Sequence, residues 1–424
     1  MVQQAGPIKQ TTLDNGLTII SERMEHVRSA TVGIWVRSGS RHEAEPLNGI
    51  SHFIEHTLFK GTRNRTSREI AVESDAIGGH VDAFTSREVA SYYVKVLDEH
   101  LPRAFDLLAD LVTSPLFANE ELDRERNVVT EEIKMVEDTP DDLVHEVFVA
   151  NFWPDHPLGR SILGTVDTLA TFDHDRVKNY FSDVYVPRNL VVAGAGNLDH
   201  ERFVDMVGGY LSGLEDRPVN LKASAPLHAK RRIILDKDLE QAHLLLGTSC
   251  PSMKSDDRYC VHVLNVILGG GMSSRLFQTI REEHGLAYAV YSGVNSYTDA
   301  GYLSVYAATS PEQLTDVIKL SIEEFNKLKG EPVSDLELER AKGQLKVSIM
   351  LSLESTSARM SNLARQEIFF GRQFTLDEIL ERIEKVSVAD VQRVAGEIFS
   401  SDELAITALG QLGSLDLEHA QIAV

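Results

Sequence analysis

The sequence predicts an α+β protein of two similar domains, each a mostly antiparallel sheet with helices packed on one face. The chain has 424 residues, which is more than one hydrophobic core usually serves. Residues 215–230 hold two prolines and little apolar periodicity, as an interdomain linker does. The flanking parts, residues 1–214 and 231–424, are nearly equal in length and faintly alike, so we expect two copies of one unit.

The likeness between the two halves lies in a helix and in a strand. Residues 121–126 and 335–340 both open an amphipathic helix with an acidic run that ends in arginine. Residues 184–196 and 398–410 both place a turn before a short apolar strand that stops at glycine. The order of these two features is the same in each half, as a repeat requires.

Hydrophobic periodicity predicts the elements of the first copy in order. Strands are expected at residues 17–23, at 30–36 and in two stretches within 80–96. Helices are expected at residues 49–59, 67–77, 101–112 and 119–136. Strands followed by grouped helices favour a sheet with helices on one face.

The composition excludes several classes of protein. Hydrophobic residues make up 42% of the chain and charged residues 25%, as in soluble globular proteins. No apolar run is long enough to span a bilayer, and residues 1–7 do not resemble a secretion or transit signal, so we expect a cytoplasmic protein without a membrane partner. The net charge of −22 argues against nucleic acid as a partner. It suits a basic peptide, although it also serves solubility alone.

The sequence contains two cysteines, Cys250 and Cys260. We expect both to be reduced thiols rather than a disulfide. Their spacing does not match a metal-binding pair.

The segment from His52 to His56, His-Phe-Ile-Glu-His, is the strongest candidate for chemistry. On a helix, positions 52 and 56 lie about 40° apart on one face, so two imidazoles can share one metal ion. Glu55 lies on the same side, where it can act as a base toward water without binding the metal. A third ligand must come from elsewhere, and the helix at 119–136 offers both Glu131 and Glu132. The alternative is an amphipathic helix with two solvated histidines.

Residues 49–62 resemble the inverted zinc motif of the pitrilysin and insulinase family of metallopeptidases. The likeness is greatest to the branch of the mitochondrial processing peptidase β subunit and its bacterial relatives. The resemblance implies a third ligand 76 positions after His56, which is Glu132. It also implies that Glu125 supports the ligands and that Glu55 is the catalytic base.

Residues 78–86 resemble the family's edge strand, to which an extended peptide adds itself by main-chain hydrogen bonds. The resemblance implies that the substrate contacts Asp82, Ala83, Phe84 and Thr85. The family usually has asparagine where this chain has Asp82, and a carboxylate offers no N–H donor. Asp82 therefore either fails to hold a substrate carbonyl or favours a basic residue. The alternative is an ordinary edge strand without a ligand.

In the second half, Arg281 and Tyr288 match a pair that faces the zinc across a closed chamber in this family. The resemblance implies that Tyr288 donates to a developing oxyanion and that Arg281 binds the substrate backbone. A tyrosine in a core and a solvated arginine are the alternative. The glycine run at 269–271 before them lacks the Gly-Lys-Ser/Thr ending of a phosphate-binding loop.

The second copy has no counterpart of the zinc motif. Aligning the two helices of the repeat places Lys346 where the first copy has Glu132, and a cation there repels a metal. We therefore expect one Zn²⁺ per chain.

The resemblance implies two chains that face each other, either as a homodimer or as a heterodimer with a motif-less homologue. The function expected is a zinc metalloendopeptidase that cleaves unfolded peptides or presequence-like segments in an enclosed chamber. The alternatives are a non-catalytic scaffold subunit and a peptide-binding protein of the same fold.

Overall fold

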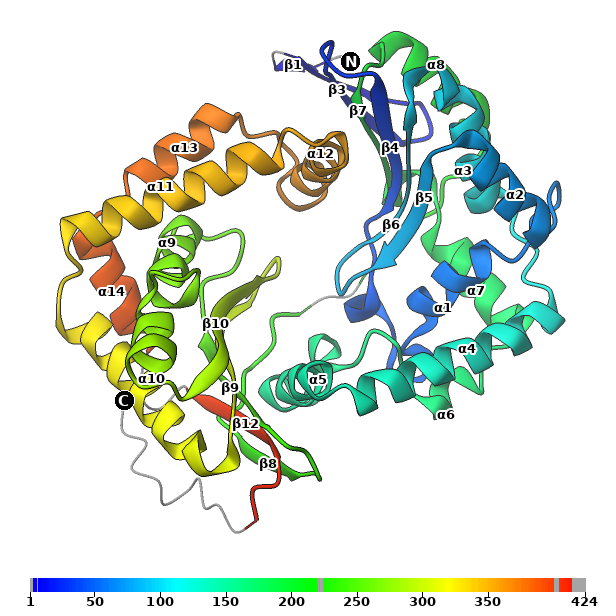
Figure 1. Cartoon of the computed structure of the whole chain (residues 1–424). Helices are drawn as coiled ribbons and strands as arrows, with labels where there is room; N and C mark the ends of the chain where they lie inside the picture. The colour runs from blue at the N-terminus through cyan, green and yellow to red at the C-terminus, as the bar shows by residue number, and fades with distance from the viewer. Residues whose placement is uncertain (1–2, 6, 220, 222–223, 400–403, 414–424) are drawn as a thin grey trace. The chain divides into compact units, whose positions relative to one another are not determined.

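The computed structural model describes residues 3–5, 7–219, 221, 224–399 and 404–413, which form two compact units (Figure 1). The first unit is drawn from Met1–Lys134, Arg160–Ala223 and Leu351–Phe374. The second is drawn from Met135–Gly159, Ser224–Met350 and Thr375–Val424. Residues 220, 222 and 223 of the predicted linker, 400–403 of the predicted turn and 414–424 lie outside the described residues.

Each unit takes residues from both halves of the sequence. Residues 135–159 precede the predicted linker but belong to the second unit, and residues 351–374 follow it but belong to the first. The compact units thus differ from the predicted contiguous halves in these two segments. The division at 215–230 stays a prediction about the repeat in the sequence.

The first unit contains a seven-stranded sheet in the order β1-β2-β3-β7-β4-β6-β5. Its strands are β1 (Gln3–Ala5), β2 (Ile8–Thr12), β3 (Thr18–Arg23), β4 (Ser29–Val36), β5 (His80–Thr85), β6 (Ala90–Leu97) and β7 (Leu190–Gly196). Neighbouring strands are antiparallel except β3 and β7, which are parallel. β5 pairs only with β6, so it is a free edge of this sheet.

Helices cover both faces of the first sheet (Figure 1). One face carries α1 (Ile50–Leu58), α2 (Ser67–Ile77), α3 (Leu101–Thr113), α7 (His174–Val184) and α8 (His200–Leu211). Of the described helices, α12 (Thr356–Phe370) covers the other face. Successive side chains of a strand point to opposite faces, and β4 follows this rule: Val32 and Ile34 enter the main core, whereas Trp35 donates to Met360 Sδ of α12 at 3.1 Å.

The second unit contains a five-stranded sheet in the order β10-β11-β9-β12-β8. Its strands are β8 (Arg232–Asp236), β9 (Ala242–Ser249), β10 (Ala287–Ser296), β11 (Gly301–Thr309) and β12 (Ala405–Gly410), and only β8 and β12 are parallel. One face packs against α9 (Arg258–Gly269), α10 (Leu314–Gly330) and α14 (Val388–Ile398). The other face packs against α5 (Pro140–Phe152), whose Phe148 is buried in a separate apolar cluster.

The remaining helices connect these layers. They are α4 (Asn119–Asp138), α6 (Val166–Leu169), α11 (Asp335–Ser352) and α13 (Leu376–Glu384), together with short 3₁₀ turns such as η1 (Ser40–His42) and the π-helix η6 (Phe277–Glu283). None of the described helices is long and apolar enough to cross a bilayer.

The predicted fold class is confirmed: each unit has a mostly antiparallel sheet and a layer of helices. The structure adds a single helix on the opposite face of each sheet. The six elements predicted with explicit bounds in the first copy begin and end within two residues of those bounds, and β5 and β6 are the two strands expected within residues 80–96, with β6 ending one residue later. β2 was missed, because its sequence Ile-Lys-Gln-Thr-Thr has too few apolar residues to signal a strand.

Cys250 and Cys260 are free thiols in this structure. Burial raises the pKa of each to about 12. Neither is therefore a reactive thiolate near neutral pH.

Candidate metal centre

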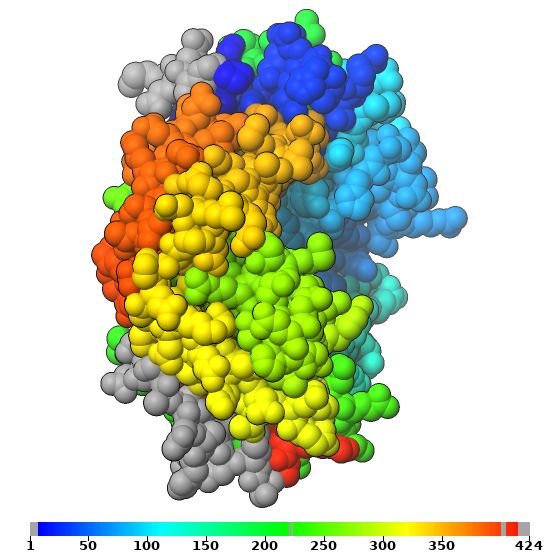
Figure 2. Space-filling view, turned by 60° about the vertical axis from the view of Figure 1, so that its left-hand side comes forward, coloured from blue at the N-terminus to red at the C-terminus, as the bar shows by residue number. Residues whose placement is uncertain are grey.

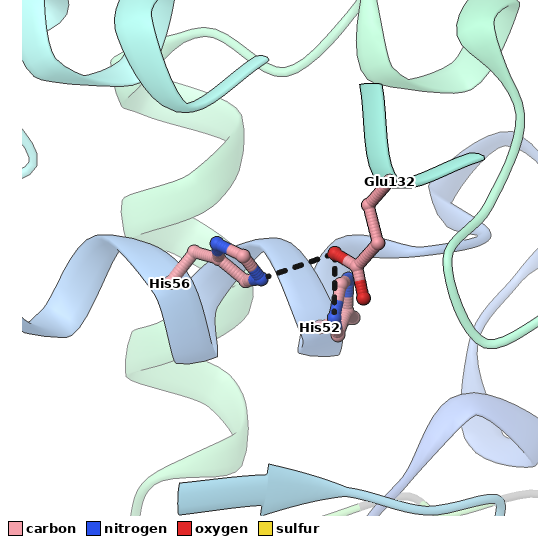
Figure 3. Close-up of side chains that lie close together, drawn as sticks. All are labelled: His52, His56 and Glu132. Atoms are coloured by element: carbon pink, nitrogen blue, oxygen red, sulfur yellow. Dashed lines mark ion pairs between the residues drawn. The ribbon is translucent and has the colours of Figure 1, made fainter. Parts of the chain in front are cut away.

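Helix α1 presents two histidines and a glutamate on one side and apolar residues on the other. Phe53 and Ile54 are fully buried in the core of the first unit and hold the helix against the sheet. Consequently His52 and His56 both turn away from the sheet, toward α4 (Figure 3). Their ring centroids are 4.7 Å apart.

Glu132 on α4 meets both imidazoles with one carboxylate oxygen. Its Oε2 lies 3.6 Å from His52 Nε2 and 3.4 Å from His56 Nε2, as the dashed lines of Figure 3 show. Within the part of the chain that the structure describes, these three residues are the single group of metal-ligand type whose donor atoms converge.

These separations fit a tetrahedral zinc ion. Zn–N and Zn–O bonds of about 2.0–2.1 Å place neighbouring ligands of a tetrahedron about 3.4 Å apart. Two imidazole nitrogens and one carboxylate oxygen also form a common donor set of catalytic zinc sites, in which a fourth position is left for water or substrate. The residues present therefore fit a zinc ion without rearrangement of the helices.

Glu125 fixes the ring of His56 from behind. Its Oε2 lies 3.3 Å from His56 Nδ1, and its Oε1 lies 2.8 Å from Lys60 Nζ. Burial opposes ionisation of Glu125, but the bonds from His56 and Lys60 prevail and lower its pKa. A carboxylate on the far nitrogen of a ligating imidazole sets the tautomer and the ring orientation. The contact has the geometry that this role requires, and the role itself stays a prediction.

The pKa values of the two histidines are shifted in opposite directions. Burial, followed by the charge of His56, lowers the pKa of His52 to about 4. Burial also acts on His56, but hydrogen bonds with Glu125 and Glu132 raise its pKa to about 9. Without a metal, His52 is thus neutral and His56 is protonated at pH 7, and a metal ion that binds both rings must release the proton of His56.

Glu55 has the environment of a base. Burial raises its pKa, while a hydrogen bond with Thr85 and the charge of His56 oppose this effect. Its Oε2 is buried and has no hydrogen-bond partner in the structure. A carboxylate in this state takes up a proton more readily than a solvated one.

The four predicted substrate-binding residues, Asp82 to Thr85, lie on the free edge strand β5, which packs beside α1. Asp82 is half exposed, accepts a hydrogen bond from Tyr93 at 2.9 Å and lies 3.3 Å from His80 Nε2. Phe84 packs edge-on against Trp35. Thr85 connects the strand to α1 through Glu55.

Comparisons with known proteins agree with this geometry. The model of the insulinase family (peptidase family M16) matches residues 18–166, and the model named peptidase M16 inactive domain matches residues 171–345. A Bacillus subtilis protein named uncharacterized zinc protease YmxG is 43% identical over 395 residues, which are 93% of this chain and 96% of that protein. The chain belongs to the insulinase family, peptidase family M16.

Further M16 relatives support the assignment. An uncharacterized zinc protease of Streptomyces coelicolor is 42% identical over 401 residues, covering 93% of this chain and 87% of its own. A protease from Helicobacter pylori has the same fold, with a TM-score of 0.88 at 23% identity over 95% of this chain and 99% of that one. The sequence matches establish the family, the structural match shows the fold alone, and the narrower likeness to the processing peptidase branch stays a prediction.

The predicted M16 pair Arg281 and Tyr288 lies in the second unit. Arg281 donates to the backbone carbonyl of Tyr288 at 2.9 Å, and its guanidinium lies 4.7 Å from the centre of the Tyr288 ring. The Tyr288 side chain is 79% exposed, so it does not belong to a core. The two residues thus form one exposed cluster, and their role at a zinc site stays a prediction.

Lys346, which the predicted alignment of the two copies places opposite Glu132, forms an ion pair with Glu384. Its Nζ lies 2.6 Å from Glu384 Oε2. The two side chains are 31% and 52% exposed, so the pair is in contact with solvent. Figure 2 shows the yellow to gold surface of the segments that include α10 and α11. Lys346 is thus half of a surface ion pair, and the loss of a metal ligand in the second copy stays a prediction.

Two residues of this M16 site were not found from the sequence. Lys60 pairs with Glu125, and Glu43 lies against the start of α1. For Lys60, the spacing of four residues after His56 is a weak signal, because residues four apart lie on the same face of a helix. No spacing rule points to Glu43, because its contacts run from a turn to a helix.

Proposed function

We propose that the protein is a zinc metalloendopeptidase with one zinc ion per chain, held by His52, His56 and Glu132, and with Glu55 as its base. The observation that carries the proposal is the convergence of both Nε2 atoms on Glu132 Oε2 at 3.6 and 3.4 Å, next to a buried glutamate of raised pKa. The relatives named zinc proteases support it.

When bound, zinc supplies a Lewis acid that polarises the peptide carbonyl and activates the attacking water. Glu55 takes the proton of that water at its buried carboxylate and passes it to the leaving amine nitrogen. Because burial raises the pKa of Glu55 toward neutral pH, its carboxylate can both accept and release a proton rapidly. Glu125, itself paired with Lys60, keeps the His56 ring in the orientation that binding requires.

The substrate we propose is an unfolded peptide or a presequence-like segment, bound as an added strand along β5. The free edge offers main-chain groups from Asp82 to Thr85 beside the base. Asp82 accepts hydrogen bonds and donates none, so it suits a peptide N–H or a basic side chain. An enclosed chamber would restrict substrates to chains without structure.

The assembly we propose is a dimer. The exposed hydroxyl of Tyr288 and the half-buried guanidinium of Arg281 form one cluster, which suits contact with a substrate oxyanion and backbone at the zinc site of a second copy. A heterodimer with a motif-less homologue would place the same pair differently.

A second candidate function follows from the name of the model that matches residues 171–345, an inactive domain. A scaffold or peptide-binding protein of the same fold would need neither the three ligands nor the base. The presence of all four residues in one place favours the enzyme.

The experiment compares the wild type, Glu55→Gln and the control Glu99→Gln, a change on an exposed turn. Zinc content is measured by mass spectrometry and cleavage with a quenched fluorescent peptide that contains basic residues. We expect about one zinc per chain in all three and a loss of activity of at least about 100-fold in Glu55→Gln only. A wild type that holds zinc and cuts no peptide would favour the scaffold, and one that binds no zinc would refute the proposal.

A further inference from the structure

The first turn of α1 has no side chain of its own to cap it. A helix leaves its first four N–H groups without intrahelical partners. Here the residue before the helix is Gly49, in a left-handed conformation with φ 93°, and it has no side chain to accept them. A Cβ at Gly49 would lie 2.7 Å from Leu163 O, so no capping residue can replace it.

Glu43, six residues before the glycine, supplies the missing acceptors. Its Oε2 accepts from Gly49 N and its Oε1 from Ser51 N, both at 2.8 Å. The side chain is only 3% exposed and follows the turn η1. One carboxylate thus spans the start of the helix that carries both histidines and Glu55.

The position of Glu43 is itself fixed. Asn48 approaches its Oε2 at 3.4 Å and donates to Ser161 O at 2.9 Å. Arg160 donates to the Glu43 backbone carbonyl at 3.4 Å. Burial raises the pKa of the Glu43 carboxyl, while the hydrogen bonds from Ser51 N and Gly49 N and the positive end of the helix favour its charged form.

The two histidines are held by different means. The His56 ring is fixed through Nδ1 by Glu125. By contrast, the buried Nδ1 of His52 has no hydrogen-bond partner in the structure. The direction of the His52 ring therefore depends on the backbone of the first turn, and Ser51, which Glu43 holds, is the preceding residue.

We infer that Glu43 is a positioning residue of the metal centre: it fixes the first turn of α1 and through it the Nε2 of His52, as Glu125 fixes His56. The inference rests on the proposed function, since it concerns the same zinc site. Glu43 touches neither substrate nor metal. It acts on the geometry of binding through two backbone N–H groups.

The test is Glu43→Gln, with Glu45→Gln as the matched control. Glu45 lies two residues away with its side chain 85% exposed, and the change in charge is the same. In Glu43→Gln the amide NH₂ faces one of the two N–H donors, so one bond is lost. We expect its zinc affinity, measured by competition with a chelator, to fall about tenfold. The control should stay within about twofold.

Two readouts separate positioning from a loss of stability. The visible spectrum of the cobalt-substituted protein reports ligand geometry, and we expect it to change in Glu43→Gln. The rise in melting temperature on adding zinc reports affinity, and we expect it to shrink. A residue with only a structural role would lower the melting temperature with and without zinc equally and leave the spectrum unchanged.

Glu43→Asp keeps the charge but is one methylene shorter, so it reaches one N–H at most. It is the second variant if Glu43→Gln does not fold, and we expect an intermediate loss of affinity. Wild-type affinity and spectrum in either folded variant would overturn the inference. None of these measurements requires cleavage, so a wild type that binds no zinc would instead refute the proposed function.

Discussion

At the scale of single residues, Glu131 and Glu132 show how the face of a helix separates neighbours in the sequence. Successive residues of a helix point about 100° apart. Glu132 faces both imidazoles, whereas Glu131 is 72% exposed and pairs with Lys134 at 2.7 Å. Only one of the two adjacent carboxylates lies within reach of a metal at α1.

We predict that Glu132→Gln lowers zinc affinity by at least about 100-fold, because it removes the one anionic ligand. Glu131→Gln is the matched control and should change affinity by less than about twofold, since it breaks only an exposed pair. Competition with a chromophoric chelator measures both. Equal losses in the two variants would show that the ligand has been wrongly identified.

The sequence predicted part of this site for a physical reason. His52, Glu55 and His56 lie within one helical turn, so periodicity alone places them together. Glu132 was chosen over Glu131 by a family resemblance, because helical geometry from the sequence could not distinguish them. Lys60 and Glu43 act through contacts between separate elements, which spacing along one helix does not encode.

At the scale of elements, strands and helices of the first copy followed from periodicity, but the partners of α5 and α12 did not. Each helix covers a sheet formed mainly by the other half of the sequence. Thr31 of β4 meets Thr356 of α12 at 2.8 Å across 325 residues. Amphipathic spacing shows that a helix buries one face, but it does not show which sheet or helix that face packs against.

The contact of α5 with its sheet predicts a sharp effect at Gly247 of β9. A Cβ there would lie 2.3 Å from Cζ of Phe148, a buried ring of α5. We expect Gly247→Ala to lower the free energy of unfolding by about 1–3 kcal/mol through overpacking.

The control for this change is Gly396→Ala. Gly396 is exposed inside α14, and nothing lies within 4 Å of the position of its Cβ. Alanine should raise the free energy of unfolding there by about 0.5–1 kcal/mol. Urea titrations measure both, and equal effects at the two positions would contradict the close contact of Phe148 with β9.

At the scale of the whole molecule, each half of the sequence contributes one helix to the unit formed mainly by the other half. The two helices concerned, α5 and α12, occupy corresponding places in the repeat. α4 and α11 begin at the two similar acidic segments of the sequence, and α5 and α12 follow them in turn. In each copy the helix after the long one belongs to the other unit. The two halves of the sequence thus share the same reciprocal arrangement, although the zinc motif is found in the first half alone.

This arrangement predicts that the two halves stay together when the connection at 215–230 is cut. A protease recognition sequence placed within residues 217–227 permits cleavage there. After cleavage, Trp35 of the first fragment still contacts Met360 of the second, and Phe148 of the first is still buried with Leu245 of the second. We expect the fragments to elute together on native size-exclusion chromatography and to separate only in denaturant.

Residues 1–214 and 231–424 expressed alone are the decisive comparison. Each lacks the helix that covers one face of its sheet, so apolar side chains such as Trp35 and Tyr302, both buried in the intact chain, would face water. Exposed apolar patches of this kind lead to aggregation or loss of cooperative unfolding. Halves that separate after cleavage, and that each unfold cooperatively alone, would show instead that 1–214 and 231–424 are independent domains whose exchanged helices contribute little to stability.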